Sequence, residues 1–129
     1  MNAAQRIQLL KILLRIIGVL LLLVYPLMLV WPSGWTWSIG YSDYPMMIVG
    51  IYATLGIFLI LAANNPAQHL SLVWFTVWSS VVHGLIMAVQ ALMMPEHHGH
   101  LLGDVPALLI IAIALAWVTP RRAQMEGLG

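Results

Sequence analysis

Polar side chains recur along one face of the apolar segment 67–94. The recurring residues are Thr76, Ser79, Ser80, His83, Met87 and Gln90. Their spacing of three, four and seven residues places them on one side of an α-helix. Because a polar side chain is unfavourable against lipid, this side is expected to face the interior of a helical bundle. The pattern predicts either hydrogen bonds between helices or a site where His83 binds a ligand or carries a proton.

Asp104 is the expected partner of His83. The apolar segment 105–119 that follows it has only 15 residues, which reach about 22 Å as a helix and are shorter than the hydrocarbon core. If this segment runs antiparallel to 67–94, with their inner tryptophans at one depth, Asp104 lies level with Met87, between His83 and Gln90. Asp104 also fits the N-cap of a helix, which does not exclude contact with His83. The predicted cofactor-binding residues are His83, Asp104, Gln90, Ser79 and Met87.

A histidine-rich loop follows the segment 67–94 and offers a second kind of chemistry. Its side chains include Glu96, His97, His98 and His100. Imidazole and carboxylate groups bind Zn²⁺ or Cu²⁺, and the nearby methionines suit Cu⁺. The spacing matches no strong zinc signature, and a polar loop at a membrane surface carries histidine without any metal. One hypothesis therefore takes these four residues as ligands of zinc or copper, and the other takes them as an ordinary surface loop.

The composition indicates that these residues belong to a protein surrounded by membrane lipid. Hydrophobic residues make up 62% of the 129 residues and charged residues 7%, against about 25% charged residues in a typical soluble domain. This excludes a water-soluble globule and makes membrane lipids the main surroundings. A net charge of +1 and the absence of cysteine exclude a basic surface for nucleic acid, disulfides and thiolate chemistry. The sequence contains no nucleophile elbow and no phosphate-binding loop.

Four apolar stretches have about the 20 residues that a helix needs to cross a bilayer. They cover residues 12–31, 45–63, 67–94 and 103–119. The sequence Asn64-Asn65-Pro66, between the second and the third stretch, is typical of a helix end and a turn. No stretch alternates in polarity as a β-barrel strand would. The sequence predicts one all-α domain, residues 1–129, that forms a bundle of four transmembrane helices.

The basic residues predict which side of the membrane each chain end occupies. All five lie near the two ends, at Arg6, Lys11, Arg15, Arg121 and Arg122. Lys and Arg collect on the cytoplasmic side, and both clusters share that side only if the number of spans is even. We therefore expect the N and C termini in the cytoplasm, with the first apolar stretch retained as a span rather than removed as a signal peptide.

Four blocks of the sequence resemble an uncharacterised family of small four-span bacterial membrane proteins, loosely similar to the DoxX-like group. The blocks are 31–35 (WPSGW), 50–56 (GIYATLG), 74–84 (WFTVWSSVVHG) and 99–108 (GHLLGDVPAL). The resemblance implies a helical bundle in a bacterial inner membrane. It implies no reaction and no cofactor, although His83, His100 and Asp104 lie inside the resembling blocks.

The sequence supports three functional interpretations of this bundle. Small residues at a spacing of three within Gly50–Gly56, and the lack of catalytic motifs, favour a non-enzymatic accessory or structural subunit of a membrane complex or homo-oligomer. The alternative is a protein that binds a metal or a metallated cofactor through His83, Asp104 and the loop His97–His100. A weaker alternative is a small enzyme that modifies a lipid or a quinone, with His83 and Asp104 as an acid–base pair.

Overall fold

The computed structural model describes residues 1–38 and 42–120, and every regular element in those ranges is a helix. The elements in chain order are α1 (Ala3–Leu22), α2 (Val24–Val30), α3 (Pro32–Trp35), α4 (Asp43–Ala62), the 3₁₀ helix η1 (Pro66–His69), α5 (Leu70–Met93), the 3₁₀ helix η2 (Pro95–Leu101) and α6 (Asp104–Val118). The predicted all-α fold is confirmed. Arg121 and Arg122, which support the predicted topology, lie outside the described residues.

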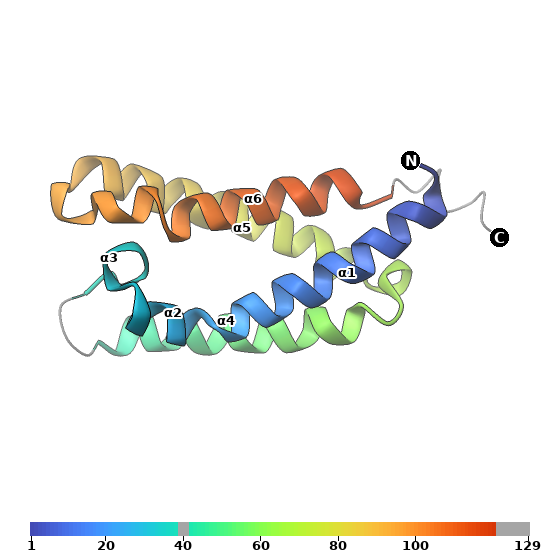
Figure 1. The fold of residues 1–129 in the computed structure, drawn as a ribbon, viewed down its shortest axis with the longest axis horizontal. Coiled ribbons are helices and arrows are strands. Elements are labelled where there is room, and N and C mark those ends of the chain that lie inside the picture. The colour runs from blue at the N-terminus through green and yellow to red at the C-terminus, as the bar shows by residue number, and fades with distance from the viewer. Residues whose placement is uncertain (39–41, 121–129) are drawn as a thin grey trace.

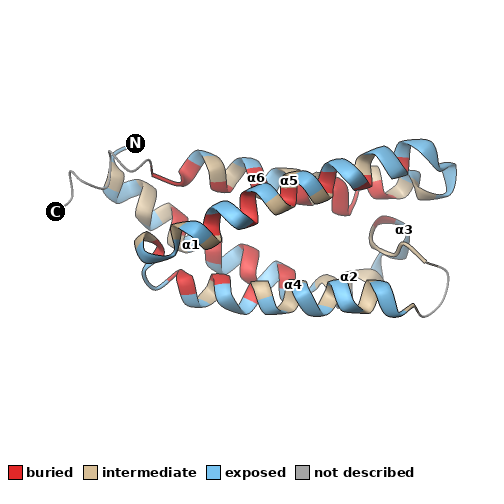
Figure 2. Ribbon diagram, turned by 180° about the vertical axis from the view of Figure 1, so that it is seen from behind, coloured by how far each residue is buried: buried red, intermediate tan, exposed pale blue. Residues whose placement is uncertain are grey.

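The long helices have the length and composition of membrane spans. Three stretches, Asp43–Ala62, Pro66–Met93 and Pro95–Val118, are apolar enough to cross a bilayer, and the bent pair α1–α2 makes a fourth if it counts as one span. Figure 2 shows exposed positions along the outward faces of the long helices. Large apolar residues occupy many exposed positions, among them Phe75 and Ile113. Such surfaces are stable only against lipid or another protein, so the fold is that of a multi-pass membrane protein.

The first span differs from the expected straight helix over 12–31. Helix α1 begins at Ala3 because Asn2 and Gln5 form a capping box, in which each side chain accepts a hydrogen bond from the other residue's backbone N–H. The helix axis then bends by 54° at the break between α1 and α2. Pro26 explains the break, since it cannot donate to the carbonyl of Leu22 and its ring crowds that carbonyl.

The bundle consists of two antiparallel helix pairs, α1 with α4 and α5 with α6 (Figure 1). Two glycines allow α1 and α4 to approach closely. A Cβ added to Gly18 would lie 2.6 Å from the carbonyl oxygen of Gly56, and a Cβ added to Gly56 would lie 2.5 Å from the carbonyl oxygen of Gly18. The two backbones therefore touch directly, as in other membrane helix pairs with small residues at the crossing. Gly50, which belongs to the predicted packing face, has open space beside it instead.

The two pairs meet at the end of the molecule that holds the N-terminus, which we call the terminal end (Figure 1). There α1 contacts α6, and the Arg6 guanidinium donates a hydrogen bond to the backbone carbonyl of Trp117 in the last turn of α6. The main buried core lies in this half and includes Leu10, Leu14 and Leu115. Toward the opposite end, which we call the loop end, the pairs diverge, and α4 and α5 form no extended contact.

Candidate functional site

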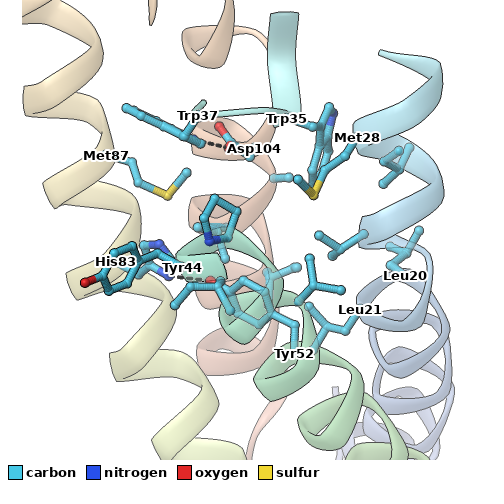
Figure 3. A pocket seen from close by; sticks show the side chains of 18 of the residues that line it. Leu20, Leu21, Met28, Trp35, Trp37, Tyr44, Tyr52, His83, Met87 and Asp104 are labelled. Atoms are coloured by element: carbon cyan, nitrogen blue, oxygen red, sulfur yellow. Dashed lines mark hydrogen bonds between the residues drawn. The ribbon is translucent and has the colours of Figure 1, made fainter. Parts of the chain in front are cut away.

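A cavity of about 700 Å³ lies between the two helix pairs in the half nearer the loop end (Figure 3). Helices α1 and α2 form one wall, α4 a second, and α5 with α6 a third, while the segment that contains α3 lies over the loop end. Most of the lining is apolar. Volumes of this size and walls of this composition are typical of sites for small organic ligands.

The hydroxyl of Tyr52 and the ring of His83 form a hydrogen-bonded pair in the wall of the cavity. Tyr52 on α4 and His83 on α5 point toward each other across the space between the helix pairs (Figure 3), and the bond joins the Tyr52 hydroxyl to Nδ1 of His83. The two rings are nearly parallel, with an interplanar angle of 10° and centroids 5.7 Å apart. This bond links α4 to α5 at a depth where the two helices otherwise stay apart.

A second polar group closes the loop end of the cavity around Asp104, the first residue of α6. Its Oδ2 accepts a hydrogen bond of 2.8 Å from the indole N–H of Trp37, and both carboxylate oxygens lie 3.0 Å from Nδ1 of His100. Nε2 of His100 lies 3.2 Å from the backbone carbonyl oxygen of Thr36. The Trp37 and His100 rings also pack with centroids 4.0 Å apart. Asp104 and His100 are both buried, so this group is shielded from water.

The partners of His100 fix the charge of this buried group. Nε2 faces the Thr36 carbonyl, which only accepts hydrogen bonds, so Nε2 carries a proton. The other ring nitrogen, Nδ1, faces the carboxyl group of Asp104. One proton therefore lies between His100 and Asp104, on one side or the other, and the pair is neutral as a whole. A neutral pair is what a buried site requires, because an uncompensated charge there is very unfavourable.

The cap over the cavity is held in place by close backbone contacts of the α3 segment with η2 and with the residue that precedes α6. A Cβ added to Gly99 would lie 2.3 Å from the Ser33 carbonyl oxygen, and one added to Gly103 would lie 2.3 Å from the Gly34 carbonyl oxygen. Glycine is the residue type that allows two backbones to approach so closely. Together with the bonds of Asp104 and His100, these contacts attach the segment 32–37 to the start of α6.

The structure brings most of the predicted cofactor-binding residues to one cavity. His83, Met87, Gln90 and Asp104 all line it, whereas Ser79 donates a hydrogen bond to the backbone carbonyl of Thr76 on its own helix. Met87 packs with Val105 and Leu108 at the start of α6. His83 and Asp104 form no direct hydrogen bond with each other. Each has a different partner, Tyr52 for His83 and His100 with Trp37 for Asp104. The acid–base hypothesis, which also allows contact through one water, stays a prediction.

Three aromatic residues of this site were not predicted from the sequence. Trp35 and Trp37 lie in a segment whose tryptophans suggest interfacial anchors, yet Trp37 bonds Asp104, and the indole N–H of Trp35 is buried with no hydrogen-bond partner among the described residues. Tyr52 lies in the middle of an apolar stretch. A phenolic hydroxyl at that depth needs a partner, which is the signal that singles out Tyr52.

The residues of the predicted metal loop take separate roles. His100 is buried against Asp104, His97 packs against the Trp37 ring with centroids 4.8 Å apart, and Glu96 and His98 are exposed. Within residues 1–38 and 42–120, no group of three or more His, Asp or Glu side chains is arranged to hold a metal ion. The zinc or copper hypothesis stays a prediction, and metal analysis of protein purified without a histidine tag tests it.

Comparison with known proteins identifies the family but no characterised relative. No curated protein and no solved structure matches the chain. A family model does match, over residues 4–126, and so covers nearly all of the sequence, including every residue of the cavity. The chain belongs to this family, which is described as a family of unknown function, DUF6632.

Proposed function

We propose that this protein binds a small lipid-soluble molecule in the cavity between its two helix pairs. The observation that carries the proposal is the cavity itself: about 700 Å³, mostly apolar, with the Tyr52–His83 pair and the Asp104 group as its main polar features. A ligand with an apolar body and one polar head matches such a wall, because the body replaces lipid contacts and the head meets a few fixed hydrogen-bonding groups.

The position of the cavity favours entry from the lipid. Tyr44 on α4 and Gln90 on α5 both line the cavity and are both exposed, Tyr44 by 77%. They lie on the side where α4 and α5 form no extended contact, and we place the entrance there. The loop end, in contrast, is covered by the segment 32–37. We therefore expect a molecule dissolved among lipid chains to reach His83 from this side.

Filling the cavity tests the proposal. Ala107 lines it from α6, so Ala107→Phe places a ring in the space, whereas Ile113→Phe changes a 70% exposed position on the same helix. We expect a lipid-soluble compound to remain bound to the wild-type protein and to Ile113→Phe after purification in mild detergent, and to be lost from Ala107→Phe. Mass spectrometry of organic extracts measures this. Equal recovery from all three proteins, or none from the wild type, contradicts the proposal.

We propose further that the protein lies in a bacterial inner membrane with its termini in the cytoplasm. Arg6, Lys11 and Arg15 lie on α1 toward the terminal end, and Glu96 lies at the loop end, which is the distribution of the positive-inside rule. The natural chain has no cysteine, so single cysteines at the exposed Gln8 and His98 report the orientation. An impermeant thiol reagent added to intact cells should label His98→Cys alone. Labelling of Gln8→Cys contradicts this topology.

A role as a subunit of a membrane complex or homo-oligomer has one supporting observation. Gly50 on α4 has no atom of the described residues within 4 Å of an added Cβ, and exposed Ile51 and Thr54 flank it. This shallow face suits a second helix. If the face is an interface, Gly50→Leu shifts the protein to smaller particles in native gels, whereas Ile57→Ala on the same helix does not. An unchanged particle size, or a monomer in the wild type, contradicts this second function.

A further inference from the structure

We infer that the cavity selects an uncharged ligand whose polar head accepts hydrogen bonds. A carbonyl group of this head accepts a hydrogen bond from Nε2–H of His83. This inference rests on the proposed function and names the chemical class of the ligand. It follows from the hydrogen-bond roles of the groups that line the cavity. The roles of three side chains carry the argument: His83, Tyr52 and Asp104.

Tyr52 determines which nitrogen of His83 carries the proton. A neutral imidazole has one N–H and one bare nitrogen. If the Tyr52 hydroxyl donates to Nδ1, both atoms of that bond are satisfied and the proton of His83 lies on Nε2. If Nδ1 donates instead, the hydroxyl proton of Tyr52 and the bare Nε2 both lack partners among the described residues. The first arrangement leaves fewer polar groups unpaired and is the stable one.

The arrangement leaves Nε2–H of His83 as a donor at the cavity wall. Nε2 forms no hydrogen bond within the described residues, and His83 is a partly buried residue of the cavity lining. Trp35 lines the opposite side of the cavity (Figure 3), but its indole N–H, which is also unpaired in the described part of the chain, is buried and out of reach of a ligand. Nε2–H of His83 is therefore the donor that lacks an acceptor, and a ligand carbonyl supplies one.

The charge of the wall excludes ionised heads. Among the described residues that line the cavity, none is Lys or Arg, so an anion such as a fatty-acid carboxylate meets no counter-charge from them. The only acidic side chain among these residues, Asp104, already shares a proton with His100 and accepts a hydrogen bond from Trp37. It therefore offers little to a cation. An uncharged head avoids the large cost of burying an unpaired ion.

Three brominated probes of equal chain length test the inference: a methyl ketone, an alkane and a fatty acid. Bromine quenches tryptophan fluorescence, and Trp35 and Trp37 line the cavity, so saturable quenching in detergent measures binding. We expect the ketone to bind about tenfold more tightly than the alkane, which corresponds to one well-formed hydrogen bond of about 1.4 kcal/mol, and the fatty acid to bind no better than the alkane. His83→Phe should remove the preference for the ketone, whereas His69→Phe, at an exposed position in η1, should keep it.

The outcomes separate this inference from the function on which it rests. If the ketone and the alkane bind wild-type protein equally well and Ala107→Phe blocks both, the cavity binds ligands and the inference about the head is wrong. The same holds if the fatty acid binds most tightly. If no probe quenches saturably, or if Ala107→Phe leaves quenching unchanged, the proposed function itself is wrong. The probe series in wild-type protein decides the matter even if His83→Phe fails to fold.

Discussion

Replacing Asp104 with leucine should destabilise the protein far more than the same change at Asp43. The two positions form a matched pair, because each aspartate is the first residue of its helix and each is followed two residues later by proline. They differ in their surroundings. Asp104 is buried and bonded to His100 and Trp37, whereas Asp43 is exposed. The comparison therefore separates the buried hydrogen bonds from the effect of a charge at a helix N-terminus.

The magnitude follows from the bonds that are lost. Asp104→Leu leaves two groups without a partner: the partly buried indole N–H of Trp37 and Nδ1 of the buried His100. At about 1.5–3 kcal/mol for each bond to a charged group, the loss is about 3–6 kcal/mol, and the leucine side chain offsets about 1 kcal/mol by its burial. We expect a net loss of about 2–5 kcal/mol in the free energy of unfolding. Asp43→Leu should cost about 0.3–1 kcal/mol, the typical contribution of a charge at a helix end.

Asparagine at position 104 refines the same comparison. Its carbonyl oxygen still accepts from Trp37, and its amide group donates to Nδ1 of a neutral His100. Asp104→Asn should therefore cost only about 1 kcal/mol. Unfolding by SDS in mixed micelles, followed by far-UV circular dichroism, measures all three variants. The assignment of roles is refuted if Asp104→Leu is as mild as Asp43→Leu, or if Asp104→Asn is as damaging as Asp104→Leu.

Two further predictions concern the contacts that hold the helices together, and the same unfolding assay measures both. Gly56→Ala should cost about 1–3 kcal/mol, because its Cβ would lie 2.5 Å from the Gly18 carbonyl oxygen, whereas Gly50→Ala should stabilise α4 by up to about 1 kcal/mol. Equal effects of the two changes would contradict the glycine crossing. Arg6→Gln should lower the free energy of unfolding by about 1 kcal/mol, because it removes the hydrogen bond to the last turn of α6. Arg15→Gln, at an exposed position, should have no measurable effect. A larger loss for Arg15→Gln than for Arg6→Gln would show that Arg6 only anchors the chain at the membrane surface.

Hydropathy was enough to predict the helical fold, since each long helix overlaps one of the predicted apolar stretches. The shape of the first span was less accessible. Its early start depends on the capping box of Asn2 and Gln5, and its bend depends on Pro26. Both signals are short and local, and an average over 20 residues conceals them. The sequence predicted one side of the glycine crossing only. The spacing of small residues within Gly50–Gly56 indicated Gly56 but not its partner Gly18.

The candidate site shows the same division between local pattern and tertiary contact. Helical periodicity predicted that His83, Met87 and Gln90 share one face, and the comparison of depths predicted that Asp104 lies near them. Both predictions depend only on distances along helices. The hydrogen-bond partners could not be derived in this way. The segment that carries Trp37 lies against the start of α6, and the chain reaches this position through the irregular region around α3. No periodic pattern in the sequence predicts this contact.

The most direct test of the central claim is an experimental density map of the protein in a lipid nanodisc. The account predicts two helix pairs that meet near Arg6 and diverge toward η2, with density for an uncharged, elongated molecule between Tyr52, His83 and Trp35. A map in which α4 and α5 pack against each other along this region, with side chains that fill the space between His83 and Asp104, would contradict it.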